Sequence, residues 1–223
     1  AKVLPKTTPA TYASSAVLLL LVVLAVVQSR ERSRVYNGSV SLWTDAIESY
    51  PDHAFFFFLR ALGHQKNFDY QLAVYDNEQA IAIDPDYFAA KIHRANNLYS
   101  LEKYDEAEQA FSELLSISPG FNYARFKLGL VYTWMGKHTQ ALNLFSYCID
   151  VDYETAYSLN NRGLVYLRMD SLEKAYDDIS ASLNMEPENE KALYHMGVYY
   201  LAKGDTTMGA DYIYRSIPNV ENR

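Results

Sequence analysis

Few side chains in this sequence have the type and spacing that catalysis or metal binding requires. The histidines are dispersed, and no two of them stand at a metal-ligand spacing on one helix; they are His53, His64, His93, His138 and His195. The single cysteine, Cys148, occupies a place where a small packing residue is expected, which favours a structural role over that of a nucleophile. We therefore expect no catalytic residue, no cofactor and no metal ion in the chain as given.

Charge is distributed unevenly along the 223 residues. The net charge is −7, but residues 1–34 carry five basic side chains and one acidic, whereas the remainder carries 15 basic and 26 acidic. This acidic majority disfavours nucleic acid as a partner, because phosphate binding needs concentrated Lys and Arg. We interpret the acidic side chains at Asp105, Glu106 and Glu108, and at Asp177 and Asp178, as solvated charge on outward helix faces.

The N-terminal part contains a long apolar segment. No charged residue occurs between Thr7 and Ser29, and about 19 residues from Ala10 would rise about 28 Å as a helix, which matches the hydrocarbon core of a bilayer. The sequence predicts a short polar segment over 1–9 and a transmembrane helix over 10–29. A cleaved signal peptide, which would leave a secreted repeat protein, and a buried core helix are the alternatives.

A repeat of 34 residues must position the remaining side chains. The prolines Pro51, Pro85, Pro119 and Pro187 share this spacing, and Tyr153 stands at the missing place. Counted from starts at residues 54, 88, 122, 156 and 190, position 8 is always Ala or Gly, position 20 is again Ala or Gly, and position 24 is mostly large and apolar. Small residues at positions 8 and 20 let two antiparallel helices pack closely, with larger residues beside them, and the proline ends the second helix.

These columns resemble the tetratricopeptide repeat (TPR), with segments such as Lys103-Tyr-Asp-Glu-Ala107 and Asn161-Arg-Gly-Leu-Val-Tyr166 matching well. The resemblance implies an all-α protein, a right-handed α-solenoid of helix-turn-helix repeats preceded by one transmembrane helix. The expected repeats cover 54–87, 88–121, 122–155, 156–189 and 190–223, after a junction and half-repeat over 30–53 whose second helix spans 40–50.

The junction is also similar to that of polytopic O-mannosyltransferase-like glycosyltransferases that end in TPRs. The similarity rests on Arg30, Arg34, Ser41-Leu-Trp-Thr-Asp-Ala46 and Tyr50-Pro-Asp52 after an apolar helix. It implies a C-terminal, substrate-recruiting domain on the exoplasmic (periplasmic or lumenal) side of a membrane. The catalytic acidic residues of that family lie in early loops, so none is transferred to this chain. The positive-inside rule, applied to the arginines after the apolar segment, favours the opposite, cytoplasmic side.

In such a solenoid, first-helix positions 2, 5, 9, 12 and 13 line the concave face. The chain is rich in tyrosine, with 20 copies, and aromatic residues there would suit a peptide groove. We predict a groove for a protein or peptide partner built from Asn96, Tyr123, Phe126, Lys127, Trp134, Tyr157, Asn160, Asn161, Lys191 and Tyr194. Some of these aromatics could instead pack between neighbouring first helices. A clamp for a C-terminal carboxylate is not expected, because Phe126 and Leu130 stand where Lys and Asn are required.

Two hypotheses follow for the whole chain. The first is a membrane-anchored TPR scaffold that binds a partner through its concave face. The second is the C-terminal TPR domain of a larger membrane glycosyltransferase whose catalytic part lies outside this chain. Tyr212, Ile213 and Tyr214 are expected near an open end of the array, a candidate surface for self-association.

Overall fold

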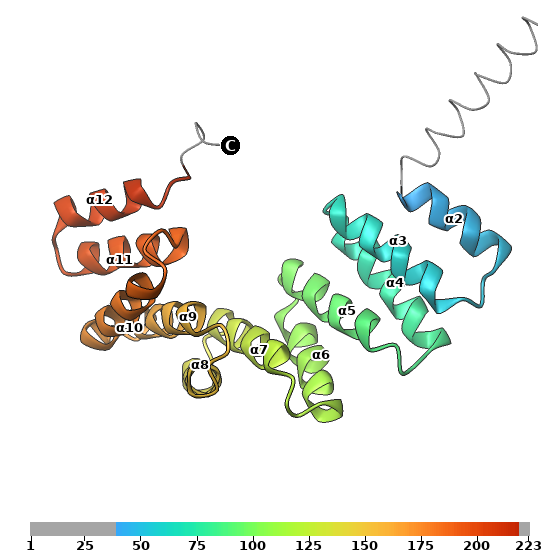
Figure 1. The fold of residues 1–223 in the computed structure, drawn as a ribbon, viewed down its shortest axis with the longest axis horizontal. Coiled ribbons are helices and arrows are strands. Elements are labelled where there is room, and N and C mark those ends of the chain that lie inside the picture. Colours follow the sequence, from blue (N-terminus) through green and yellow to red (C-terminus); the bar gives the residue numbers. More distant parts are fainter. Residues whose placement is uncertain (1–38, 219–223) are drawn as a thin grey trace, which may run out of the picture. The chain divides into compact units, whose positions relative to one another are not determined.

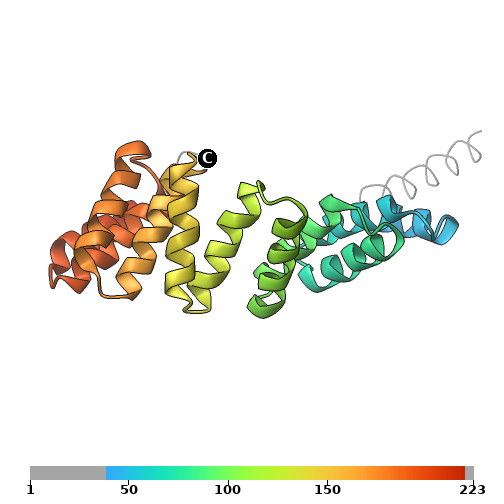
Figure 2. The same ribbon diagram turned by 90° about the horizontal axis from the view of Figure 1, so that it is seen from below.

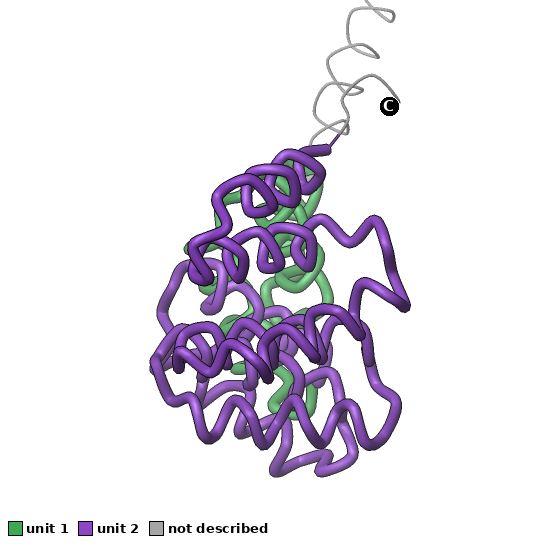
Figure 3. Tube along the Cα trace, turned by 90° about the vertical axis from the view of Figure 1, so that its left-hand side faces the viewer, with its two compact units in different colours: residues 1–87 green, residues 88–223 purple. Residues whose placement is uncertain are grey.

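The structure, a computed structural model, describes residues 39–218, and all regular structure in this range is α-helical. The chain divides into two compact units, residues 1–87 and 88–223, which are described separately (Figure 3). The transmembrane helix predicted over 10–29 lies outside the described residues. Among the helices of residues 39–218, none combines the length and the apolar character needed to cross a membrane.

The described part of the first unit consists of three helices, α2 (Ser39–Ser49), α3 (Ala54–Lys66) and α4 (Tyr70–Ile83), and α3 packs against both of the others (Figure 1). Trp43 of α2 stacks on Phe56 of α3, with ring centroids 6.0 Å apart and planes at 16°. Ala61 of α3 and Ala73 of α4 are fully buried, so the two helices approach closely at the small residues that the repeat columns predict.

The second unit continues with helix pairs of the same kind. Its first helices are α5 (Phe88–Ser100), α7 (Asn122–Trp134), α9 (Thr155–Arg168) and α11 (Glu190–Ala202). Its second helices are α6 (Tyr104–Ile117), α8 (His138–Asp150), α10 (Leu172–Met185) and α12 (Thr206–Arg215). Each helix packs against its neighbours in sequence, and α9 also contacts α7 and α11 directly (Figures 1 and 2). The prediction of an all-α fold built from TPR-like helix pairs is therefore confirmed.

The pairing within each repeat depends on position 8. A Cβ atom added to Gly163 would lie 2.6 Å from Cγ1 of Ile179, at position 24, and 3.3 Å from the carbonyl oxygen of Ala175, at position 20. At Gly129 the same atom would lie 2.8 Å from the Phe145 ring. The large residue of the second helix thus occupies the space left by the missing side chain of the first.

The turn between the two helices of a repeat also recurs. Position 15 has a positive φ in every repeat, at Phe68, Glu102, Gly136, Asp170 and Gly204. Only two of these residues are glycine, the residue type that enters the left-handed region without steric cost. The turn geometry is therefore imposed by the packing of the flanking helices rather than by the turn residue.

Buried ion pairs join helices in both units. Arg162 of α9 donates from Nε and Nη2 to the two Asp178 carboxylate oxygens at 2.7 and 2.8 Å, and from Nη1 to Ser146 Oγ at 3.0 Å. The interpretation of Asp178 as solvated charge was wrong: it is 7% exposed, because the guanidinium of α9 covers it. In the first unit the Arg60 guanidinium donates hydrogen bonds to the Asp76 carboxylate at 2.8 and 2.7 Å and to Thr44 Oγ1 at 3.3 Å. This is the arrangement of Arg162, Asp178 and Ser146, three repeats earlier in the chain.

Candidate functional site

A cavity of about 490 Å³ is formed by the first helices of the second unit. Its lining comes from α5, α7, α9 and α11 and from the turn before α9. The lining residues are Tyr99, Tyr123, Phe126, Lys127, Leu130, Thr133, Trp134, Tyr153, Glu154, Tyr157, Asn161, Leu164, Lys191 and His195. Six of these side chains are aromatic, and two carry an ammonium group.

Helical spacing explains why these residues share one surface. On α7, the residues Tyr123, Lys127, Leu130 and Trp134 recur at intervals of three or four, which places them along one face. The same spacing joins Tyr157, Asn161 and Leu164 on α9 and Lys191 and His195 on α11. The cavity is therefore assembled from matching faces of successive first helices.

The aromatic side chains are held in place by polar contacts. The Tyr123 hydroxyl donates to Asn96 Oδ1 at 2.8 Å, and Trp134 Nε1 donates to the Tyr99 hydroxyl at 3.0 Å. The Trp134 ring also lies parallel to that of Tyr104, and the Arg168 guanidinium carbon lies 4.6 Å from its centroid. Trp134 is nevertheless 51% exposed, so the cavity presents a large aromatic surface whose orientation is already fixed.

The charge in the cavity is mainly positive and is not neutralised by ion pairs. Lys127 Nζ lies 5.4 Å from the Tyr123 ring and 5.9 Å from the Tyr99 ring, in cation–π contact. Burial, followed by the like charge of Lys191, lowers the pKa of the Lys127 ammonium. Among residues 39–218, no carboxylate oxygen lies within 4.0 Å of the charged nitrogens of Lys127, Lys191 or Arg168.

His195 adds a neutral polar group. Burial, followed by the charges of Lys191 and Arg168, lowers its pKa to about 4, so the imidazole is uncharged near pH 7. Its Nδ1 lies 2.8 Å from Asn160 Oδ1, an oxygen that can only accept, so we assign the ring proton to Nδ1. The second ring nitrogen, Nε2, then remains as an acceptor.

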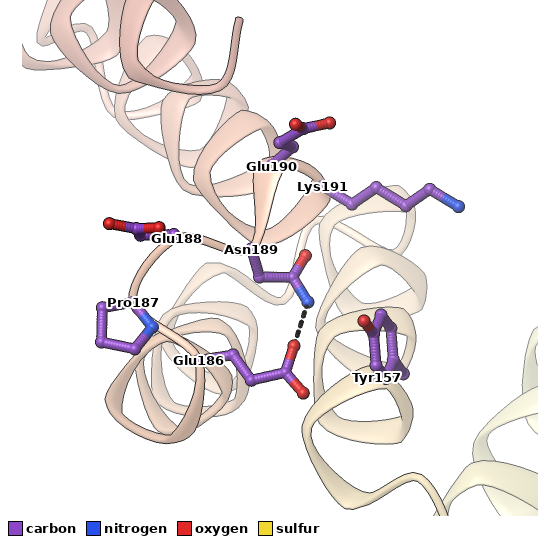
Figure 4. A pocket seen from close by; sticks show the side chains of 7 residues that line it. All are labelled: Tyr157, Glu186, Pro187, Glu188, Asn189, Glu190 and Lys191. Atoms are coloured by element: carbon purple, nitrogen blue, oxygen red, sulfur yellow. Dashed lines mark hydrogen bonds between the residues drawn. The ribbon is translucent and has the colours of Figure 1, made fainter. Parts of the chain in front are cut away.

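A shallower hollow of about 800 Å³ adjoins this cavity and shares Tyr157 and Lys191 with it (Figure 4). The remaining lining of this hollow is acidic and includes Glu186, which accepts a hydrogen bond from Asn189 Nδ2 at 2.9 Å. The charge of Glu186, more than burial, raises the pKa of the Tyr157 phenol. In Figure 4 the Lys191 ammonium extends away from the Glu186 and Glu190 carboxylates. Tyr157 thus lies between an acidic hollow and a basic cavity.

The cavity brings together seven of the ten residues predicted for the groove: Tyr123, Phe126, Lys127, Trp134, Tyr157, Asn161 and Lys191. Asn96 supports the Tyr123 hydroxyl from outside the lining. Tyr194 is 50% exposed and makes an edge contact with the His195 ring, but it does not line the cavity. Asn160 differs from the prediction, because it is fully buried and orients His195 rather than facing the groove.

Sequence reasoning missed Tyr153 and Glu154 as lining residues. Tyr153 stands where the other repeats have proline, and the turn that contains it has two residues with positive φ, Asp152 and Glu154. The altered turn places the Tyr153 ring 6.5 Å from that of Phe126. The interrupted proline spacing was the signal that could have located these residues.

Comparisons with known proteins agree with this architecture. Residues 89–121 and 123–151 each match a family model described as tetratricopeptide repeat. Together with the helix pairs and their structural neighbours, these matches support a TPR-repeat protein. Among individual proteins, an 82-residue segment is 34% identical to small glutamine-rich tetratricopeptide repeat-containing protein 2 of Saccharomyces cerevisiae. The match covers 37% of this chain and 24% of that protein, so the chain spans about a quarter of its length.

Solved structures with a similar fold include two that are described as TPR proteins. A TPR protein from Parabacteroides merdae superposes with a TM-score of 0.69 at 20% identity, covering 96% of this chain and 82% of that one. MamA from Desulfovibrio magneticus gives 0.64 at 18% identity, covering 73% and 92%. YrrB, a TPR protein with an unusual peptide-binding site, gives 0.57 at 19% identity, covering 81% and 93%. At these identities the likeness shows the fold alone.

Proposed function

We propose that the chain is an interaction scaffold that binds an extended peptide segment of a protein partner in the cavity between α5, α7, α9 and α11. The observation that carries this proposal is the exposed but fixed Trp134 ring, held by Tyr99, Tyr104 and Arg168. Rigid aromatic side chains dominate binding energy at interfaces because they bury a large area at low entropic cost. YrrB, which shares the fold, supports a peptide as the kind of ligand.

The test is a selection of random 12-residue peptides, displayed on phage, against the full chain in mild detergent. Affinities of selected peptides are then measured by fluorescence anisotropy. Trp134→Ala and Tyr157→Ala should each weaken binding about tenfold to a hundredfold, the cost of truncating a central aromatic anchor. The melting temperature should change little, because both side chains are at least 40% exposed.

Tyr75→Ala is the matched control for this experiment. Tyr75 is 53% exposed, belongs to the first unit and is not among the residues that line the cavity, so its loss should leave the affinity unchanged. Selected peptides that bind Trp134→Ala and Tyr157→Ala as tightly as the unmodified chain would contradict the proposed site.

The wider setting of the scaffold is proposed from the sequence. The apolar segment over 10–29 favours attachment to a membrane. The similarity of the junction to TPR-bearing membrane glycosyltransferases favours the exoplasmic side and recruitment of a glycosylation substrate by the same groove. Sequencing the coding region upstream of Ala1 separates the two hypotheses, since a glycosyltransferase would require further transmembrane segments there.

A further inference from the structure

Lys127 is a charged group without an anionic partner in a partly enclosed place. Its ammonium faces the rings of Tyr99 and Tyr123, and no carboxylate within residues 39–218 lies within ion-pair distance of it. A desolvated charge is costly unless an opposite charge compensates it. Two other lysines of this unit, by contrast, have a carboxylate partner: Lys91 pairs with Glu113 at 2.8 Å, and Lys137 pairs with Glu108.

The surroundings of Lys127 add further positive charge that no nearby carboxylate compensates. Lys191 lines the same cavity and repels Lys127, and Arg168 lies at its edge over Trp134. Glu154 is the single acidic residue among the lining side chains. The described cavity is therefore basic in a chain whose net charge is −7, so its sign is opposite to that of most of the molecule.

We infer that the cavity takes a peptide segment with an acidic side chain, Asp or Glu, whose carboxylate lies between Lys127 and Lys191. This inference rests on the proposed peptide binding and adds the chemistry of the partner. The carboxylate accepts hydrogen bonds from the two ammonium groups, and the apolar neighbours of the acidic residue lie against Phe126, Leu130 and Trp134.

The carboxylate in question belongs to a side chain within the segment rather than to a chain end. The cavity provides ammonium groups from two helices, Lys127 of α7 and Lys191 of α11, and the neighbouring Phe126 and Leu130 side chains have no hydrogen-bond donor. The neutral His195 lines the same surface and retains an acceptor nitrogen, which suits a backbone N–H of the passing segment.

The test uses the peptide selection described above, followed by synthesis of one selected peptide in three forms: the original with its Glu or Asp, the Gln or Asn analogue, and a Lys analogue. The unmodified chain should bind the acidic form about tenfold more tightly than the amide form. Lys127→Gln and Lys191→Gln should each lower this ratio, because each removes one of the two charges that bind the carboxylate, while the amide form binds them as before. Lys203→Gln removes the same charge at an exposed site outside the cavity and should keep the tenfold ratio.

Three further measurements test the inference in ways that do not depend on the glutamine variants. Lys191→Glu, at an exposed position, should reverse the order so that the Lys analogue binds more tightly than the acidic form. NMR of 13C-dimethylated lysines should show the pKa of the Lys127 amine rising when the acidic peptide binds, because the carboxylate compensates burial and the charge of Lys191. A C-terminal amide on the peptide should leave its affinity unchanged.

The possible failures are distinguishable. Selected peptides that depend on Trp134 but bind equally well in the acidic and amide forms overturn the acidic partner and leave the proposed peptide binding intact. A loss of affinity on C-terminal amidation overturns the assignment to an internal side chain. A selection that enriches no peptide overturns both proposals.

Discussion

At the residue scale, the environment of His195 shows how the fold sets the charge of a single group. Its imidazole lies on α11 in the cavity, near two positive charges and a buried amide partner. Burial and those charges hold its pKa at about 4, below the ordinary value of 6.5. The native state therefore binds this proton less readily than the unfolded chain does.

The pH dependence of stability follows from this difference. His195 contributes stability that is complete above pH 6.5 and is lost as the pH falls toward 4, because the unfolded chain then gains a proton that the native state does not. Between pH 7.5 and pH 5 the loss should be about 2 kcal/mol of unfolding free energy. Urea unfolding at both pH values, applied to the unmodified chain and to His195→Gln, measures it.

The Gln side chain can still donate a hydrogen bond to Asn160, but it does not titrate. Between pH 7.5 and pH 5 the unfolding free energy of His195→Gln should therefore fall by about 2 kcal/mol less than that of the unmodified chain. His53→Gln, at an exposed histidine of the first unit, should retain the original dependence. Identical pH profiles for the unmodified chain and His195→Gln would show that the imidazole is not held neutral by the fold.

At the element scale, the contact of position 8 with position 24 determines how closely two helices of a repeat approach. Gly163 of α9 accommodates Ile179 of α10, whereas in the first repeat Ala61 stands at the same position and Asn77 opposite it. The two positions do not vary together in a fixed way, since Phe stands opposite Ala95 in the second repeat and opposite Gly129 in the third. The approach distance of a helix pair depends on the volumes at both positions.

Gly163→Ala should therefore destabilise the second unit by about 1–3 kcal/mol, the usual cost of overpacking a tight contact. The added Cβ would lie 2.6 Å from Cγ1 of Ile179, so either this side chain or the helix that carries it must shift. Chemical denaturation of Gly163→Ala, of Ile179→Ala and of the double variant measures the coupling. The double variant should be more stable than the sum of the single effects predicts, because the second change removes the clashing atom.

Gly120→Ala provides the control, since nothing lies within 4 Å of a Cβ there. It should leave stability unchanged or raise it slightly. Strict additivity of Gly163→Ala and Ile179→Ala would mean that the two positions do not limit the approach of the helices.

At the scale of the whole molecule, the two units contain equivalent ion-pair networks. Thr44, Arg60 and Asp76 form one in the first unit, and Ser146, Arg162 and Asp178 form the other in the second. In repeat proteins stability is approximately a sum of local terms, because each repeat contacts mainly its neighbours. The equivalent networks allow this property to be tested within one chain.

Asp76→Asn and Asp178→Asn should each destabilise their own unit by about 2–4 kcal/mol, because each leaves a partly buried guanidinium without its countercharge. Hydrogen exchange followed by mass spectrometry should show lost protection in α3 and α4 for the first variant and in α9 and α10 for the second. Loss of protection in both units from either substitution would show that the chain unfolds as one cooperative body.

The sequence predicted much of the repeat and part of the site. The helices α3, α5, α7 and α11 begin at residues 54, 88, 122 and 190, and α9 begins one residue before 156. Regular spacing made this possible, because residues of similar size at equivalent positions produce similar local contacts. The prediction failed at particular residues. Tyr153 stands in place of proline, and the turn that contains it differs from the others. Asp178 forms an ion pair with Arg162, sixteen residues earlier in the chain.

The sequence by itself determined that the chain forms helix pairs, because the 34-residue spacing of small, large and turn residues specifies contacts between near neighbours. Only the tertiary structure decided which polar groups are buried and which remain without a countercharge. Asn160 meets His195 across 35 residues, and Lys127 meets the rings of Tyr99 and Tyr123 from two helices. Such properties depend on the summed burial and charge around a group, and these exist only once successive first helices lie side by side.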